Sequence, residues 1–158
     1  MARVALTDLM LVAAVAAAVV LLLWPRGRGA GVAEPASWTV TPGVVNEVVT
    51  QATVSETICS PGWTRSIRPP TSYTSSLKLE QLRRFGLRGG PSRYQEDHLI
   101  SLELGGDPTD PRNLWPEPYP RASDVDRIEN ELNAEVCGGK LTLAQGQQKE
   151  SELKHNDG

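Results

Sequence analysis

The stretch EDHLISLELGGDPTDPRNLWPEP, residues 96–118, contains one of the two histidines of this 158-residue chain. His98 follows two acidic residues and precedes a glycine pair and an Asn-Leu-Trp-Pro block. The period-two pattern of residues 94–104 predicts a strand or a tight two-strand element. Gly105 and Gly106, followed by Asp-Pro, predict a turn. A histidine with these neighbours is a candidate catalytic residue.

Helices are expected on both sides of this stretch. Prolines and glycines in residues 59–73 argue against a helix there, and leucines at helical spacing then predict one over residues 76–85. After the stretch, Ser123 can cap a helix that runs to about residue 137. Its apolar stripe is formed by Val125, Ile128, Leu132 and Val136. A last amphipathic piece covers residues 143–153 and a frayed tail follows it. This order of elements predicts an α+β domain.

The beginning of the chain differs from the rest in composition. Residues 9–24 are uncharged and apolar, which suits a signal peptide or a short membrane span. We interpret residues 1–33 as a signal peptide or membrane anchor, residues 34–57 as a linker, and residues 58–154 as the folded domain. The protein is expected to be exported or membrane-anchored, with an extracytoplasmic domain favoured over a cytoplasmic one. The membrane is a partner through residues 9–24 if the leader is not cleaved.

Cys59 and Cys137 are the only cysteines of the chain. An even number of cysteines behind an export-type leader predicts a disulfide between them. The alternative is two reduced thiols, which applies if the domain faces the cytoplasm. Two cysteines and scattered histidines do not form a zinc-finger spacing.

The charges are distributed unevenly along a chain whose net charge is −3. A negative net charge argues against a general nucleic-acid-coating protein. The segment of residues 65–93 is nevertheless basic. Its seven candidates for phosphate contact are Arg65, Arg68, Lys78, Arg83, Arg84, Arg88 and Arg93. Residues 96–135 contain eleven acids and three bases. Bases that hold phosphates beside acids that hold a metal are typical of a metal-dependent enzyme acting on a polyanion, although a solvated surface of both signs is the simpler alternative.

Hydrolysis of a phosphodiester with one metal ion requires a base and oxygen ligands. Histidine suits the base, because its ordinary pKa lies near neutrality, and His98 is the candidate. Asp97 is the candidate ligand beside it. A second ligand must come from the helix after Ser123, and the candidates are Asp126, Glu129 and Asn130. Asn113 can bond the backbone of the intervening loop.

These residues resemble the HNH endonuclease family, of the ββα-metal (His-Me finger) type. The matching positions are Asp97 to Leu102, the glycine pair 105–106, and Asn113 to Pro116. The segment from Cys59 to about residue 144 is also similar to small bacterial HNH-like proteins, often exported. The shared features there include Gly62-Trp63-Thr64, Arg68-Pro69-Pro70 and a Leu77-Lys78 pair.

The resemblance implies a ββα-metal core with flanking helices, preceded here by the N-terminal hydrophobic helix. It implies a metal-dependent endonuclease with His98 as general base and Asn113 in the catalytic motif. The expected cofactor is a divalent metal, Mg²⁺ in the first place, with Mn²⁺ or Zn²⁺ as alternatives, and no small-molecule cofactor. The expected partner is nucleic acid, DNA in preference to RNA. The alternative is a catalytically inactive HNH-like domain that binds or supports other molecules at the cell envelope.

Overall fold

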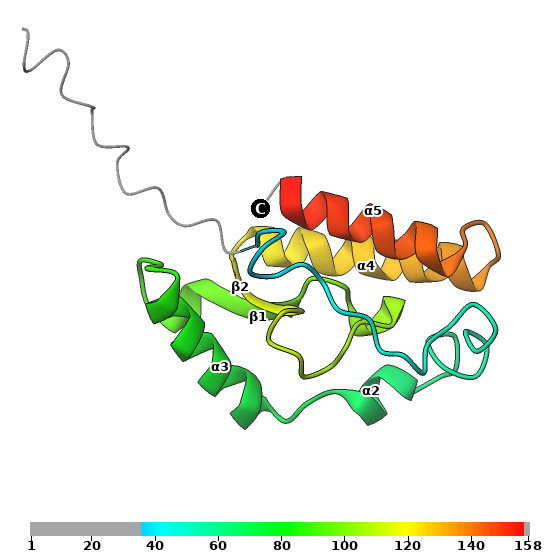
Figure 1. Cartoon of the computed structure of the whole chain (residues 1–158), viewed down its shortest axis with the longest axis horizontal. Coiled ribbons are helices and arrows are strands. Elements are labelled where there is room, and N and C mark those ends of the chain that lie inside the picture. The colour runs from blue at the N-terminus through cyan, green and yellow to red at the C-terminus, as the bar shows by residue number, and fades with distance from the viewer. Residues whose placement is uncertain (1–35, 157–158) are drawn as a thin grey trace, which may run out of the picture. The chain divides into compact units, whose positions relative to one another are not determined.

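A computed structural model describes residues 36–156 of the chain (Figure 1). These residues form a mixed α+β structure with a two-stranded antiparallel sheet and four α-helices. The α-helices are α2 (Trp63–Ile67), α3 (Thr71–Arg84), α4 (Arg121–Cys137) and α5 (Leu143–Asn156). The strands are β1 (Tyr94–His98) and β2 (Leu114–Pro118), and two 3₁₀ helices are η1 (Pro91–Arg93) and η2 (Leu102–Leu104). The α+β prediction is confirmed.

The side chains of residues 94–98 in β1 alternate between the two faces of the sheet, which two helices contact. Asp97 pairs with Trp115, and His98 pairs with Leu114. Because successive side chains of a strand point to opposite faces, Gln95 and Asp97 share one face and Glu96 and His98 the other. Helices α3 and α4 both contact the sheet. Gln95 bonds Asp126 of α4, so the face of Asp97 is the one toward α4.

The strand ends earlier than its sequence pattern predicts. Residues 94–104 were expected as a strand, but β1 stops at His98. Leu99 and Ile100 are both buried, although they would point to opposite faces of a strand. The chain instead turns through η2, and Gly105 follows with a φ of 79°. A Cβ on Gly106 would lie 1.8 Å from the Ile100 carbonyl oxygen, so only glycine fits there.

The helices before the sheet extend further than the prolines suggested. Helix α2 lies inside the segment 59–73 that was expected to be free of helix, and α3 begins at Thr71 instead of residue 76. Both differences have the same cause. A proline does not prevent a helix that begins or ends beside it, because no N–H donor is needed at a helix boundary. Pro70 is the N-cap residue of α3, and Pro69-Pro70 separate the two helices.

The segment expected to be a linker, residues 34–57, packs onto the domain over its described part. Ala36 and Val49 belong to the main hydrophobic core. Trp38 stacks on the ring of His155 with 3.6 Å between ring centroids. A ring nitrogen of His155 lies 2.9 Å from the Thr41 carbonyl oxygen. The compact domain therefore includes residues before position 58.

The main core lies between this segment, η2, β2 and the antiparallel pair α4 and α5 (Figure 1). Trp115 is fully buried in it. Cys59 and Cys137 form the predicted disulfide, which joins the segment before α2 to the end of α4. This bond is compatible with an oxidising, extracytoplasmic location.

The predicted N-terminal hydrophobic helix, residues 9–24, lies outside the described residues. Within residues 36–156, none of the helices has the length and apolar character needed to span a bilayer.

Candidate metal centre

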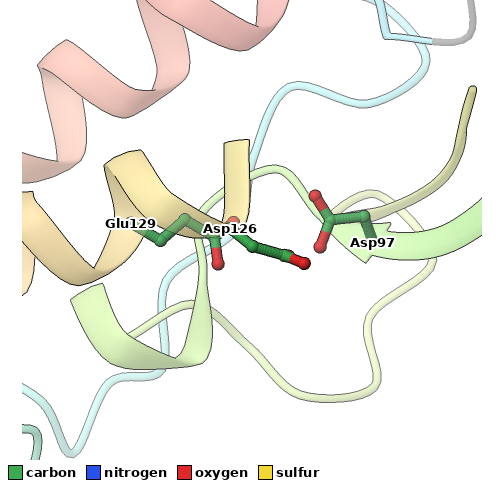
Figure 2. Close-up of side chains that lie close together, drawn as sticks. All are labelled: Asp97, Asp126 and Glu129. Carbon is green, nitrogen blue, oxygen red and sulfur yellow. The ribbon is translucent and has the colours of Figure 1, made fainter. Parts of the chain in front are cut away.

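Three carboxylates from two elements converge beside the end of β1 (Figure 2). Asp97 is the second-last residue of β1, and Asp126 and Glu129 lie three residues apart on α4. A spacing of three residues places both α4 side chains on one face of the helix. One oxygen from each of the three carboxylates lies within 4.8 Å of the others. The structure thus brings together one predicted strand ligand and two of the three predicted helix ligands.

Carboxylate oxygens are the donors that hard divalent cations prefer. Magnesium and manganese fit this donor set better than zinc, since the cluster of Asp97, Asp126 and Glu129 contains no nitrogen or sulfur ligand. The residues present therefore fit the expected Mg²⁺ or Mn²⁺ ion.

The carboxylates face a polar cleft of about 360 Å³. Residues from β1, η2 and α4 line it, together with Arg68, which directly follows α2, and Ser101, which directly precedes η2. They are Arg68, Gln95, Glu96, Asp97, His98, Ser101, Leu102, Glu103, Asp126, Glu129 and Asn130. Candidate metal ligands, the candidate base and one basic residue therefore share a single opening.

Asp126 is oriented by a short chain of hydrogen bonds from the sheet. The Gln95 amide donates to Asp126 Oδ1 at 3.0 Å, and Tyr119 Oη donates to Gln95 Oε1 at 3.0 Å. Asn130 behaves differently, because its amide donates to the Asp126 carbonyl oxygen of its own helix at 2.6 Å. Asn130 lines the cleft but is turned back toward the helix, which leaves Asp126 and Glu129 as the helix carboxylates of the cluster.

His98 is buried, with 6% of its surface exposed. Its Nε2 lies 3.1 Å from the Pro108 carbonyl oxygen. A carbonyl oxygen only accepts, so Nε2 carries the proton of the neutral ring and Nδ1 is the basic nitrogen. Burial lowers the pKa of His98, and this effect outweighs the opposing contributions of the Pro108 hydrogen bond and of Asp97. The ring is therefore neutral at neutral pH, which is the state that a general base requires.

Asn113 is fully buried and holds the loop between the strands. Its Oδ1 accepts from the Val44 and Ile100 N–H groups, at 3.2 and 2.9 Å. Its amide donates to the Ile100 and Asp107 carbonyl oxygens, at 3.0 and 2.9 Å. All four bonds go to backbone, and Asn113 does not line the cleft. The structure places Asn113 as a support of the loop that carries Pro108, the partner of His98.

Lys154 was missed in the sequence, where it falls in the tail expected to fray. It is fully buried in α5. Its ammonium donates to Asp97 Oδ2 at 3.1 Å, to Glu129 Oε1 at 2.5 Å and to the His98 carbonyl oxygen at 2.5 Å. Glu150, one turn earlier in α5, lies 3.5 Å away. The only sequence signal for the position of Lys154 is its i,i+4 spacing from Glu150. That spacing is common on exposed helix faces.

The buried charges of this cluster act on one another. Burial opposes the ionisation of Asp97, but the Lys154 ammonium and a hydrogen bond with Glu117 together outweigh it and hold the pKa of Asp97 below its usual range. Burial raises the pKa of Glu129 to about 9, against the effect of Lys154. The surrounding carboxylates outweigh burial for Lys154 and raise its pKa. Asp97 and Lys154 are therefore both ionised in the metal-free cluster at neutral pH.

Of the seven predicted phosphate-binding residues, only Arg68 lines the cleft. Lys78 donates to the Tyr94 carbonyl oxygen at 3.0 Å and so connects α3 to β1. The other five are exposed and lie outside the cleft lining, namely Arg65, Arg83, Arg84, Arg88 and Arg93.

Glu96, to which the sequence assigned no role, is a half-buried acid of the cleft. Both of its carboxyl oxygens are buried without a hydrogen-bond partner in the described part of the chain. Burial raises its pKa from 4.5 to about 8, with Lys78 opposing and Asp97 adding to the shift. The folded protein therefore holds a proton on Glu96 that the unfolded chain releases near pH 4.5.

Glu96→Gln is expected to stabilise the metal-free protein in a pH-dependent way. In the wild type, the contribution of the raised Glu96 pKa to the free energy of unfolding is fully present below pH 4.5 and is lost as the pH rises to about 8. Glutamine cannot ionise, so the variant does not lose stability in this way. The melting temperature of the variant minus that of the wild type should increase from pH 4.5 to 8 and level off above it. Thermal unfolding in the presence of a chelator measures this difference. Glu80→Gln, at an exposed position of α3, is the control, and parallel curves for wild type and Glu96→Gln would contradict the prediction.

Comparison with models of known protein families, with curated proteins and with solved structures found no match for this chain.

Proposed function

We propose that this protein is a metal-dependent nuclease of the HNH type, with a ββα-metal core formed by β1, β2 and α4. The observation that carries the proposal is the convergence of Asp97, Asp126 and Glu129 in a cleft that also contains His98. The antiparallel strand pair followed by a helix is the arrangement that the family resemblance predicts.

In the proposed reaction, Asp97, Asp126 and Glu129 would hold a divalent ion at the cleft. The ion, when bound, supplies Lewis-acid stabilisation of the phosphate and of the leaving oxygen. His98 accepts the proton of the attacking water through Nδ1, since Nε2 is committed to Pro108. Arg68 lines the same cleft and binds the phosphate. The preferred substrate is DNA.

A second candidate function is a non-catalytic HNH-like domain that binds or supports other molecules. The observation that favours it is Lys154, whose buried ammonium already supplies a positive charge to Asp97 and Glu129. A domain of this kind keeps its fold without a metal ion and does not cleave nucleic acid.

The two candidates differ in an assay with plasmid DNA and Mg²⁺ or Mn²⁺. A nuclease is expected to cut plasmid only with the metal, and Asp126→Asn should lower both cleavage and Mn²⁺ affinity by at least about tenfold, because it removes a charged ligand. Asp124→Asn, an exposed carboxylate of the same helix, is the matched control and should change neither. Cleavage by the Asp126→Asn variant at the wild-type rate would overturn the assignment of the metal site. Failure of the wild type both to cut DNA and RNA and to bind metal would favour the non-catalytic domain.

A further inference from the structure

The ammonium of Lys154 occupies a position between two candidate metal ligands. It bonds one oxygen of Asp97 and one oxygen of Glu129, from the side of the core. The side chain is fully buried, so it does not reach a substrate in the cleft. The same two carboxylates are members of the cluster that fits a divalent cation. The Lys154 ammonium is thus already bound to two of the carboxylates that are expected to bind the metal ion.

A buried ammonium would need only one carboxylate to be neutralised. Glu150 meets that need from the preceding turn of α5, and its oxygens also accept from the Ser101 N–H at 3.1 and 3.0 Å. Lys154 nevertheless lies closer to Asp97 and Glu129, at 3.1 and 2.5 Å, than to Glu150, at 3.5 Å. Its shortest carboxylate contacts are therefore with the cluster on β1 and α4 and not with its own helix.

We propose that Lys154 competes with the divalent ion for the carboxylates of Asp97 and Glu129. Because its ammonium and the ion share these ligands, Lys154 weakens metal binding. The inference rests on the proposed metal site. Two cations that share ligands a few ångströms apart repel each other, and the low polarity of the interior strengthens that repulsion. In the metal-free protein, the Lys154 ammonium compensates the charge of Asp97 and donates to Glu129. To hold the metal, Glu129 would have to exchange part of its contact with the ammonium for contact with the ion.

The test is the Mn²⁺ affinity of the full chain carrying Lys154→Met, measured by isothermal titration calorimetry. Methionine is close to lysine in length and has no charge. The variant is expected to bind Mn²⁺ at least about tenfold more tightly than the wild type, because the competing charge is gone. Its metal-free form is expected to melt at a lower temperature, since buried Asp97 loses its cationic partner, and Mn²⁺ should restore the lost stability.

Two further variants make the result interpretable. Lys149→Met removes an exposed lysine of the same helix and should leave Mn²⁺ affinity and melting temperature unchanged. Lys154→Met combined with Glu150→Gln removes one acid and one base, and the glutamine oxygen can still accept from the Ser101 N–H. This double variant serves if the single variant does not fold without metal, and it too is expected to bind Mn²⁺ more tightly than the wild type.

The outcomes separate this inference from the proposed function. Wild-type affinity, or weaker affinity, in the Lys154→Met and double variants would overturn the inference while leaving the metal site in place. Binding by the variants alone would support the inference and show that Lys154 blocks the site in the wild type. Absence of Mn²⁺ binding in every protein would overturn the metal site itself and this inference with it.

Discussion

Replacing His98 by alanine is expected to reduce metal-dependent cleavage by about 10²–10⁴-fold, the usual contribution of a general base. His98 is the one histidine of the cleft, and its burial keeps the ring neutral. Single-turnover cleavage of a labelled DNA duplex in Mg²⁺ measures the loss. Mn²⁺ affinity should remain near the wild-type value, because His98 is not one of the clustered carboxylates. A loss of rate with intact metal binding is the signature of a missing base.

The same assay has a predicted pH dependence. The base acts in its neutral form, so the rate rises as the pH passes the pKa of His98 and then reaches a plateau. Since burial lowers this pKa below its ordinary value of 6.5, the plateau is reached before neutral pH. His155→Ala is the matched control, since His155 contacts Ser151 and Thr41 and lies outside the cleft lining. Cleavage by His98→Ala at the rate of His155→Ala would exclude the proposed mechanism.

Removing the disulfide by Cys59→Ser and Cys137→Ser is expected to lower the free energy of unfolding by about 4–5 kcal/mol, on the chain-entropy model. The two cysteines are 78 residues apart, so the bond closes a loop that contains both strands and nearly all of α4. A small domain has a total stability of about 5–15 kcal/mol, so this loss is a large share of it. Urea unfolding of the wild type and the double variant measures the difference.

Reductant provides an independent control for the disulfide. It should destabilise the wild type by the same amount and leave the double variant unchanged, because only the wild type has a bond to reduce. Cys137 is exposed at the end of α4, so the bond is accessible to reductant. Equal unfolding midpoints for oxidised wild type and the double variant would show that the bond adds nothing to stability.

Much of the site follows from short-range patterns. Residues 94–106 predict a strand that contains Asp97 and His98, followed by a glycine turn, and the structure has both, although the strand ends at His98. The apolar stripe of α4 determines which side chains face the sheet, so helical periodicity is enough to propose Asp126 and Glu129 as ligands. Between these candidates and Asn130, the sequence did not discriminate. The choice depends on side-chain direction, and the Asn130 amide bonds its own helix.

Other features depend on contacts between distant parts of the chain. Glu96 looks like a surface residue in the sequence, yet the packing around it raises its pKa to about 8. Residues 36–57 have the composition of a linker, yet Ala36 and Val49 are buried in the core. In both cases the local composition is polar or flexible, and only the neighbours brought in by folding decide the burial.

The sequence by itself determined the α+β class, the cysteine pair and the strand, turn and helix that carry Asp97 and the α4 carboxylates, because each depends on local periodicity or on a count. The tertiary structure alone decided the position of Lys154, 57 residues from Asp97 in the chain and 3.1 Å from it in space. A lysine and a glutamate one turn apart near a chain end predict an exposed helix. Whether such a pair is exposed or buried depends on which face of α5 packs against α4 and η2, and long-range packing alone settles that choice.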